Sequence, residues 1–137
     1  MRVLIADDSE VFAQHLLQAL GEINGVEIVG HARTGAEALQ AVYNLRPEVV
    51  ILDIRMPGGS GIDVLESMKS EKVTPITIVM TNFNYSQYRK KCLQLGARFF
   101  FDKSAEFAKV CEVLRLLAHR ASASTEDGFD VTEHGAP

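Results

Sequence analysis

Cysteine is scarce in this sequence, with only two residues of that type among 137. Cys92 and Cys111 match no ligand spacing of a metal site, and two cysteines are too few for the disulfide framework of a small secreted domain. We therefore predict two buried thiols in a reducing compartment.

Long hydrophobic runs are also missing. The chain begins MRVLIADDSE, where the apolar run 3–6 ends at two acids and is too short for a signal peptide. No stretch approaches the ~20 consecutive apolar residues of a membrane-spanning helix. Without a targeting or membrane segment, the expected location is cytoplasmic.

Nor is there an excess of positive charge. The formal net charge is −4, with 14 lysines and arginines against 18 acidic residues. A nucleic-acid-binding surface usually shows as a basic balance, so we do not expect direct DNA binding. The remaining composition is ordinary for a globular protein, and the length fits one domain with its own core.

Five short apolar runs, rich in β-branched and aromatic residues, alternate with segments of helical spacing. The runs are residues 3–6, 26–29, 49–52, 76–80 and 99–101. Alternating strands and helices predict a parallel sheet covered by helices on both faces, and near-continuous apolar strands are what such a sheet requires. The predicted fold is α/β and doubly wound, with five strands and five flanking helices.

Residues at the predicted helix ends support this division. Residues 34–37 (TGAE) indicate an N-terminal capping box, and residues 60–63 (SGID) indicate a looser one. Gly21 and Gly96 are predicted to lie at helix C-termini.

The composition changes after residue 120. Residues 121–137 (ASASTEDGFDVTEHGAP) are mostly small, hydroxyl-bearing or acidic, with Phe129 as their one aromatic. So little apolar surface does not offset the entropy of ordering the segment, which predicts a domain over 1–120 and a flexible tail over 121–137. A short partner-binding segment centred on Phe129 is the alternative.

Polar residues follow four of the five predicted strands. Asp7 and Asp8 come directly after the first run, Asp53 after the third, Thr81 after the fourth, and Lys103 one residue beyond the fifth. The carboxyl ends of parallel strands meet at one edge of the sheet, which is where α/β proteins form their sites. We therefore expect these side chains to converge, although they lie far apart in the sequence.

The expected cluster suits phosphoryl transfer. Three crowded carboxylates need a cation to stay ionised, and a set of oxygen ligands favours Mg²⁺. A lysine and a threonine hydroxyl can hold phosphoryl oxygens, and an aspartate can act as the nucleophile that carries the phosphoryl group. The glycines after Asp53 let the following loop bend tightly, which would leave this acid uncovered.

These motifs resemble the receiver domain of two-component response regulators. The resemblance rests on Asp7-Asp8, on residues 52–61 (LDIRMPGGSG), on Thr81, and on the pattern Gly96-Ala97…Phe100…Lys103. It covers residues 1 to about 120 and is closest in kind to the single-domain chemotaxis receivers. It implies a flavodoxin-like sheet with the strand order 2-1-3-4-5.

The resemblance also implies a phosphorylation site. Asp53 would accept a phosphoryl group from a sensor histidine kinase or a histidine phosphotransfer protein. Mg²⁺ would be bound directly by Asp8, Asp53 and the backbone carbonyl of Arg55, and Asp7 would act through a metal-bound water.

Further roles follow from the same resemblance. Thr81 and Lys103 would bind the phosphoryl group. Movement of Thr81 would free space for Phe100 to swing inward and reshape the face made by the fourth helix, the fifth strand and the fifth helix. A homodimer could form through this face, and the sequence does not decide whether it does. Arg55 and Phe83 occupy positions that tune phosphate lifetime in this family.

The sequence departs from the family pattern at three positions. Phe100 stands where tyrosine is frequent, Asn82 where a small residue usually follows the threonine, and Ser104 where proline usually follows the lysine. The geometry of the peptide between Lys103 and Ser104 is therefore left open.

We predict a stand-alone receiver that signals by phosphorylation-dependent protein binding or by phosphorelay. It would catalyse only its own phosphorylation and dephosphorylation, so it is not expected to be an enzyme. One alternative is a phosphohydrolase that forms an aspartyl phosphate, although such enzymes carry Asp-x-Asp after the first strand, where this chain has Asp7-Asp8-Ser9. The other is a docking module that works independently of phosphorylation.

Overall fold

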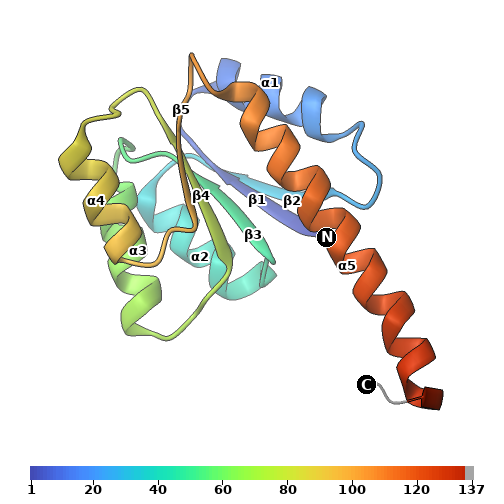
Figure 1. The fold of residues 1–137 in the computed structure, drawn as a ribbon. Coiled ribbons are helices and arrows are strands. Elements are labelled where there is room, and N and C mark those ends of the chain that lie inside the picture. The colour runs from blue at the N-terminus through green and yellow to red at the C-terminus, as the bar shows by residue number, and fades with distance from the viewer. Residues whose placement is uncertain (135–137) are drawn as a thin grey trace.

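The computed structural model describes residues 1–134, in which strands and helices alternate (Figure 1). In chain order the elements are β1 (Arg2–Ala6), α1 (Glu10–Leu20), β2 (Glu27–Ala32), α2 (Gly35–Leu45), β3 (Val49–Leu52), α3 (Gly61–Ser70), β4 (Ile76–Thr81), α4 (Ser86–Gln94), β5 (Phe99–Asp102) and α5 (Phe107–His134). The strand pairs are parallel, and the sheet has the order β2-β1-β3-β4-β5. The predicted doubly wound α/β fold with strand order 2-1-3-4-5 is confirmed.

Each face of the sheet carries its own hydrophobic cluster, because successive side chains of a strand point to opposite sides. In β1, Leu4 belongs to the cluster covered by α2, α3 and α4, whereas Val3 and Ile5 belong to the cluster covered by α1 and α5. Val49 and Val50 divide in the same way in β3. Figure 1 shows the same two layers of helices on either side of the sheet. The central strands are thus buried on both faces, as their apolar runs predict.

The edge strand β2 lies further along the chain than the predicted run 26–29. It contains Gly30 and His31, which interrupt the apolar pattern, and only its last residue, Ala32, is fully buried. Its pairing with β1 nevertheless continues to the pair Ala6–Ala32. Backbone hydrogen bonding to one neighbour, and not apolar content, sets the length of this strand.

The predicted helix ends are largely confirmed. The Ser60 hydroxyl accepts from the Asp63 backbone N–H, and the Asp63 carboxylate accepts from the Ser60 N–H, which completes a capping box at α3. The Thr34 hydroxyl caps α2 in the same way, but the carboxylate of Glu37 accepts from the N–H of Arg33 instead of Thr34. The box predicted as the looser one is therefore the complete one.

The predicted boundary at residue 120 is not the end of a helix. The backbone of α5 stays helical through His134, and in Figure 1 its last turns project beyond the sheet. A helix already nucleated on the sheet extends by one hydrogen bond per added residue, whether or not the added side chains are apolar. The division into a domain over 1–120 and a flexible tail over 121–137 stays a prediction. Residues 135–137 lie outside the described residues, and the binding role considered for Phe129 stays a prediction.

No helix in the described part of the chain combines the length and the apolar character needed to cross a membrane.

Leu114 anchors α5 on the sheet, and its side chain is fully buried. We expect Leu114→Ala to lower the free energy of unfolding by about 2–5 kcal/mol, the range for truncating a buried leucine. Leu116 lies two residues further along the same helix and is 60% exposed. Leu116→Ala should therefore change the free energy of unfolding by less than about 0.5 kcal/mol. Urea denaturation followed by circular dichroism measures both variants. Equal losses would contradict this docking of α5.

Candidate functional site

Three carboxylates meet at the carboxyl edge of the sheet, as the sequence predicts. Asp7 and Asp8 follow β1, and Asp53 follows the neighbouring strand β3. One carboxylate oxygen of each lies within 4.8 Å of the others. Asp7 and Asp53 are only 2% and 6% exposed, whereas Asp8 faces solvent. Three hard oxygen donors with one open side fit Mg²⁺, which retains several water ligands when it binds to proteins.

Lys103 lies between two of these carboxylates. Its Nζ is 2.7 Å from Oδ2 of Asp7 and 2.9 Å from Oδ2 of Asp53, and its side chain is 9% exposed. Burial lowers the pKa of the ammonium, but hydrogen bonds to both carboxylates and their charges outweigh burial, so the pKa of Lys103 is raised. The lysine is therefore held in its charged form against the acidic cluster.

Asp7 shows the opposite balance. Burial raises the pKa of its carboxyl group, and the negative charge of Asp53 adds to the rise. Hydrogen bonds from Lys103 and from the backbone N–H of Ser9 oppose the rise without cancelling it. Three carboxylates beside one lysine also leave an excess of negative charge in the cluster, which favours a cation site.

The loop after Asp53 bends back on the strand that precedes it. Gly58 and Gly59 have positive φ angles of 67° and 108°, which glycine adopts without strain. At Gly61, a Cβ atom would lie 2.2 Å from the backbone oxygen of Asp53, so no other residue fits. The loop bends as predicted, but it does not leave Asp53 uncovered, because the lysine ammonium lies against the carboxylate.

Thr81 ends β4 between the acidic cluster and β5. Its side chain is fully buried, and its hydroxyl oxygen accepts from the backbone N–H of Phe83 at 3.1 Å. The hydroxyl hydrogen can still donate to a further oxygen. The backbone oxygen of Thr81 accepts from the N–H of Lys103 at 3.0 Å, which ties the lysine to β4.

Arg55 and Phe83, the two residues predicted to influence phosphate lifetime, contact each other. The guanidinium carbon of Arg55 lies 4.4 Å from the centre of the Phe83 ring, a cation–π arrangement. The backbone N–H of Arg55 also points at Oδ1 of Asp53, with a long separation of 3.4 Å. The pair therefore spans from the Asp53 loop to the segment after Thr81.

Phe100, the predicted switch residue, points inward. It is 3% exposed and belongs to the cluster under α2, α3 and α4. Arg89 on α4 donates to its backbone oxygen at 3.2 Å and places its guanidinium carbon 5.7 Å from the ring centre. Movement of Phe100 stays a prediction.

Several contacts at the site had no signal in the sequence. Phe12 on α1 lies with its ring centre 4.4 Å from Nζ of Lys103, and its ring meets that of Phe107 edge to face. The Nε2 of His31 lies 2.7 Å from the backbone oxygen of Asp7. Each contact joins elements far apart in the chain, so no spacing rule reveals it.

The peptide between Lys103 and Ser104 is trans, and no cis peptide bond occurs among the described residues. This answers the question that serine in place of the usual proline left open.

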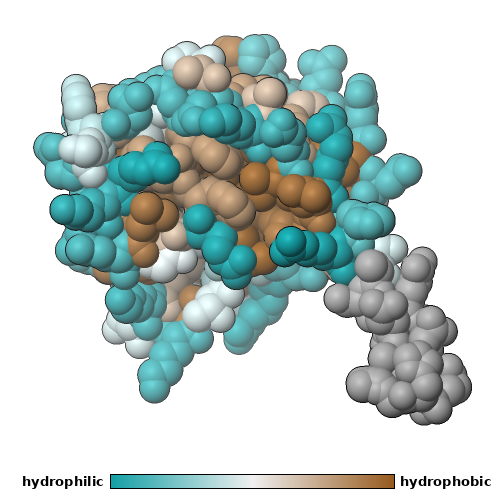
Figure 2. All heavy atoms as spheres, in the orientation of Figure 1, coloured by the Kyte–Doolittle hydropathy of each residue, from teal (hydrophilic) through white to brown (hydrophobic). Residues whose placement is uncertain are grey.

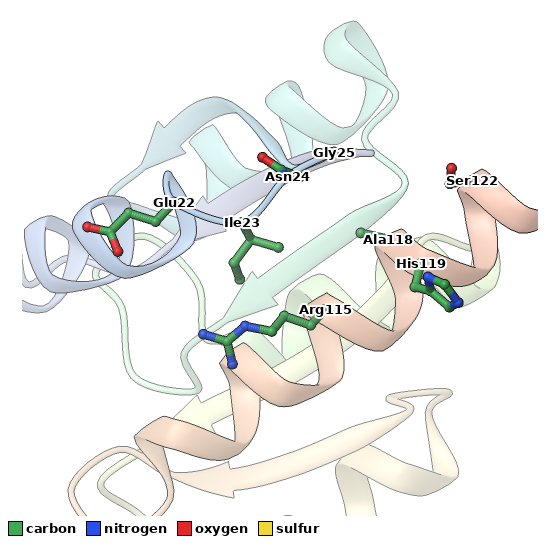
Figure 3. Close-up of a pocket in the computed structure, with 8 residues that line it drawn as sticks. All are labelled: Glu22, Ile23, Asn24, Gly25, Arg115, Ala118, His119 and Ser122. Atoms are coloured by element: carbon green, nitrogen blue, oxygen red, sulfur yellow. The ribbon is translucent and has the colours of Figure 1, made fainter.

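A hollow lies at the end of the sheet opposite to the acidic cluster. It has a volume of about 430 Å³ and is lined by residues 22–25 and by one face of α5 (Figure 3). Arg115 and His119 from α5 and Glu22 from the turn after α1 line it, so side chains that carry charges of opposite sign are present. None of the predicted site residues contributes to it.

Comparison with known proteins agrees with the geometry of the site. The family model of the response regulator receiver domain matches residues 3–115, which include every residue of the candidate site. The response regulator GacA of Pseudomonas viridiflava is 28% identical over 117 residues, which are 85% of this chain and 55% of that protein. The chain thus spans about half the length of the curated relatives it matches first.

Solved structures give the same result. The receiver domain of the putative response regulator NarL from Mycobacterium tuberculosis superposes with a TM-score of 0.79 at 28% identity, covering 86% of this chain and 95% of that one. A chain in the CheX–CheY–BeF₃–Mg²⁺ complex from Borrelia burgdorferi superposes with a TM-score of 0.76 at 31% identity, covering 86% of this chain and 87% of that one.

Replacing Lys103 by methionine would leave Asp7 and Asp53 facing each other without a cation. At pH 7 without Mg²⁺, we expect Lys103→Met to lower the free energy of unfolding by about 3 kcal/mol, as when a buried ion pair loses one member. Mg²⁺ should restore much of this loss, because it takes over the neutralisation of the carboxylates. Denaturation with and without Mg²⁺ measures both effects.

The matched control is Lys109→Met, since Lys109 pairs with Glu106 at the surface at 3.0 Å. Its effect should stay below about 0.5 kcal/mol in either condition. A Lys103→Met variant as stable as the wild type without Mg²⁺ would show that the lysine does not balance the cluster.

Proposed function

The chain belongs to the response regulator receiver domain family, and we propose that it accepts a phosphoryl group on Asp53 in a Mg²⁺-dependent reaction. The observation that carries this proposal is the pairing of the Lys103 ammonium with Asp7 and Asp53, beside the third carboxylate of Asp8. Phosphoryl transfer depends mainly on positioned charges. This edge of the sheet holds charges of both signs within contact distance.

The acidic cluster would hold the metal ion. Asp8, Asp53 and the backbone carbonyl of Arg55 would bind Mg²⁺ directly, and Asp7 would act through a water. When bound, Mg²⁺ offsets the negative charge of the carboxylates and of the phosphoryl oxygens. Asp8 is the exposed member of the cluster, so it is the carboxylate that an ion from solution meets first.

The transfer step is a substitution at phosphorus. A carboxylate oxygen of Asp53 would attack the phosphohistidine of a sensor histidine kinase or histidine phosphotransfer protein, forming a P–O bond as the P–N bond breaks. Lys103, which contacts Oδ2 of Asp53, would then bind one phosphoryl oxygen, and the Thr81 hydroxyl would donate to another. The leaving histidine takes up a proton and returns to its neutral form.

The output would be a change in protein binding, by a receiver that acts as a stand-alone switch or as a phosphorelay carrier. The face toward the viewer in Figure 2 gathers apolar side chains between α4 and α5, where β5 lies. Phe99 and Phe101 of β5 are partly buried and stack with ring centres 5.8 Å apart. We propose this surface for the downstream protein or for a second copy of the chain, coupled to Asp53 through Thr81 and Phe100.

The acceptor can be tested by intact mass after incubation with acetyl phosphate. The wild type with Mg²⁺ should gain one phosphoryl group, and it should gain none without Mg²⁺ or in Asp53→Asn, which lacks the nucleophilic carboxylate. The matched control is Asp63→Asn, because Asp63 is exposed and only caps α3. An adduct that persists in Asp53→Asn would contradict the assignment.

Two further assays on the wild-type protein distinguish the proposal from its two alternatives. A phosphohydrolase would turn over a generic phosphomonoester many times, whereas a receiver would be labelled once per chain. A module independent of phosphorylation would bind no beryllofluoride in the presence of Mg²⁺. Either result would overturn the proposed function.

The Arg55–Phe83 contact should lengthen the life of the phosphorylated state. A ring held over this side of the site would keep water from the acyl phosphate, so we expect Phe83→Ala to shorten its half-life about two- to fivefold, the range that an exposed cation–π contact allows. Release of radiolabelled phosphate after removal of the donor measures this half-life.

A second variant separates bulk from the cation–π contact. Phe83→Leu keeps much of the volume but loses the aromatic face, so its half-life should lie between those of the wild type and Phe83→Ala. Identical half-lives for all three proteins would exclude shielding by this residue.

A further inference from the structure

We propose that Asp102 is a positioning residue for Lys103: its carboxylate holds the turn 103–105 in the shape that directs the lysine ammonium to the phosphoryl site. The inference rests on the proposed function and adds to it a residue that contacts neither the metal cluster nor the phosphoryl group. It is carried by the hydrogen bonds around the turn between β5 and α5.

A single carboxylate oxygen organises this turn. Oδ1 of Asp102 accepts from the backbone N–H of Ser104 at 2.8 Å, from the Ser104 hydroxyl at 2.7 Å and from the backbone N–H of Ala105 at 3.0 Å. Bonds of this kind, from a short acidic side chain to the next backbone N–H groups, are what fold a chain into a tight turn. The Lys103 backbone lies within the closed ring that they form.

A second pair of bonds closes the turn toward α5. The N–H of Asp102 donates to Oε1 of Glu106 at 2.9 Å, and the N–H of Glu106 donates to the backbone oxygen of Asp102 at 2.9 Å. On the sheet side, the N–H of Lys103 donates to the backbone oxygen of Thr81 at 3.0 Å. The backbone at Lys103 is thus held on both sides, and only the side-chain torsions remain free.

The turn uses donors that the family's usual residue lacks. Ser104 stands at the position where proline usually follows the lysine, and both its N–H and its hydroxyl bind Asp102. Proline has neither group. Asp102 and Ser104 therefore form a unit in which each depends on the other, and the trans peptide between Lys103 and Ser104 lies inside it.

The electrostatics agree with this geometry. Hydrogen bonds from the Ser104 hydroxyl and from the backbone N–H groups of Ala105 and Ser104 hold the pKa of Asp102 below its usual value. Asp102 is therefore ionised at neutral pH and works as an acceptor throughout the physiological range.

The test compares Asp102→Ala, which removes the acceptor, with Asp102→Asn, which keeps an accepting oxygen at nearly the same place but removes the charge. Calorimetry would measure Mg²⁺ affinity first and beryllofluoride affinity in saturating Mg²⁺ second. We expect Asp102→Ala to bind beryllofluoride on the order of tenfold more weakly, because Lys103 no longer meets the phosphoryl mimic in place. Asp102→Asn should stay within about twofold of the wild type.

Mg²⁺ affinity separates positioning from general damage. Lys103 occupies oxygens of Asp7 and Asp53, two carboxylates of the proposed metal site. Loosening the lysine should therefore leave Mg²⁺ affinity unchanged or raise it, while beryllofluoride affinity falls. A parallel fall of both affinities would overturn the proposal, because it would indicate a disordered site. So would an Asp102→Asn variant as weak as Asp102→Ala.

Ser104→Ala provides a milder perturbation. It removes one of the three bonds to Oδ1 and should weaken beryllofluoride binding about two- to threefold, so it carries the test if Asp102→Ala does not fold. Wild-type affinity in both Asp102→Ala and Ser104→Ala would overturn the positioning role alone. Absence of beryllofluoride binding by the wild type would instead overturn the proposed function, and the positioning role with it.

Discussion

The ion pairs that join Lys103 to Asp7 and Asp53 are the interaction on which the rest of the site depends. The two aspartates follow neighbouring strands, but the lysine follows β5, and β4 lies between β3 and β5. Because neighbouring strands are about 4.8 Å apart, only a long side chain on a turn that bends back over the edge can reach both carboxylates. The strand order, the turn after β5 and the length of lysine are thus parts of one constraint.

The burial of the two aspartates determines how the charges of the cluster balance. Asp7 and Asp53 are almost entirely removed from water, and one ammonium does not neutralise three carboxylates. Burial is the main cause of the raised pKa of Asp7, whereas the hydrogen bonds and charges of the two carboxylates raise the pKa of Lys103 against the effect of burial. A divalent cation bound by these carboxylates would remove the excess of negative charge, so affinity for the ion and relief of repulsion would have the same origin.

The fold and the convergence of polar residues at one edge of the sheet were predictable because both depend on local patterns, whereas the roles of these residues stay predictions. Apolar runs mark buried strands, and a polar residue at the end of a parallel strand lies at the same edge as its neighbours. The contacts of Phe12 with Lys103 and of Arg55 with Phe83 depend on the separation of elements in space, which spacing does not encode. The backbone of α5 is helical beyond residue 120, where apolar content no longer marks a helix, because helix propagation does not need apolar burial.

Contacts around Thr81 connect the site with β5 and, through Phe100, with α4. The backbone oxygen of Thr81 accepts from Lys103, and strand pairing joins β4 to β5, where Val79 faces Phe100. Arg89 binds the backbone oxygen of Phe100 and also contacts its ring, and only the second contact depends on the rotamer. A switch at Phe100 would therefore turn the ring while Arg89 keeps the strand in place, so that the signal reaches the surface as a change of side chains and not as a displacement of β5.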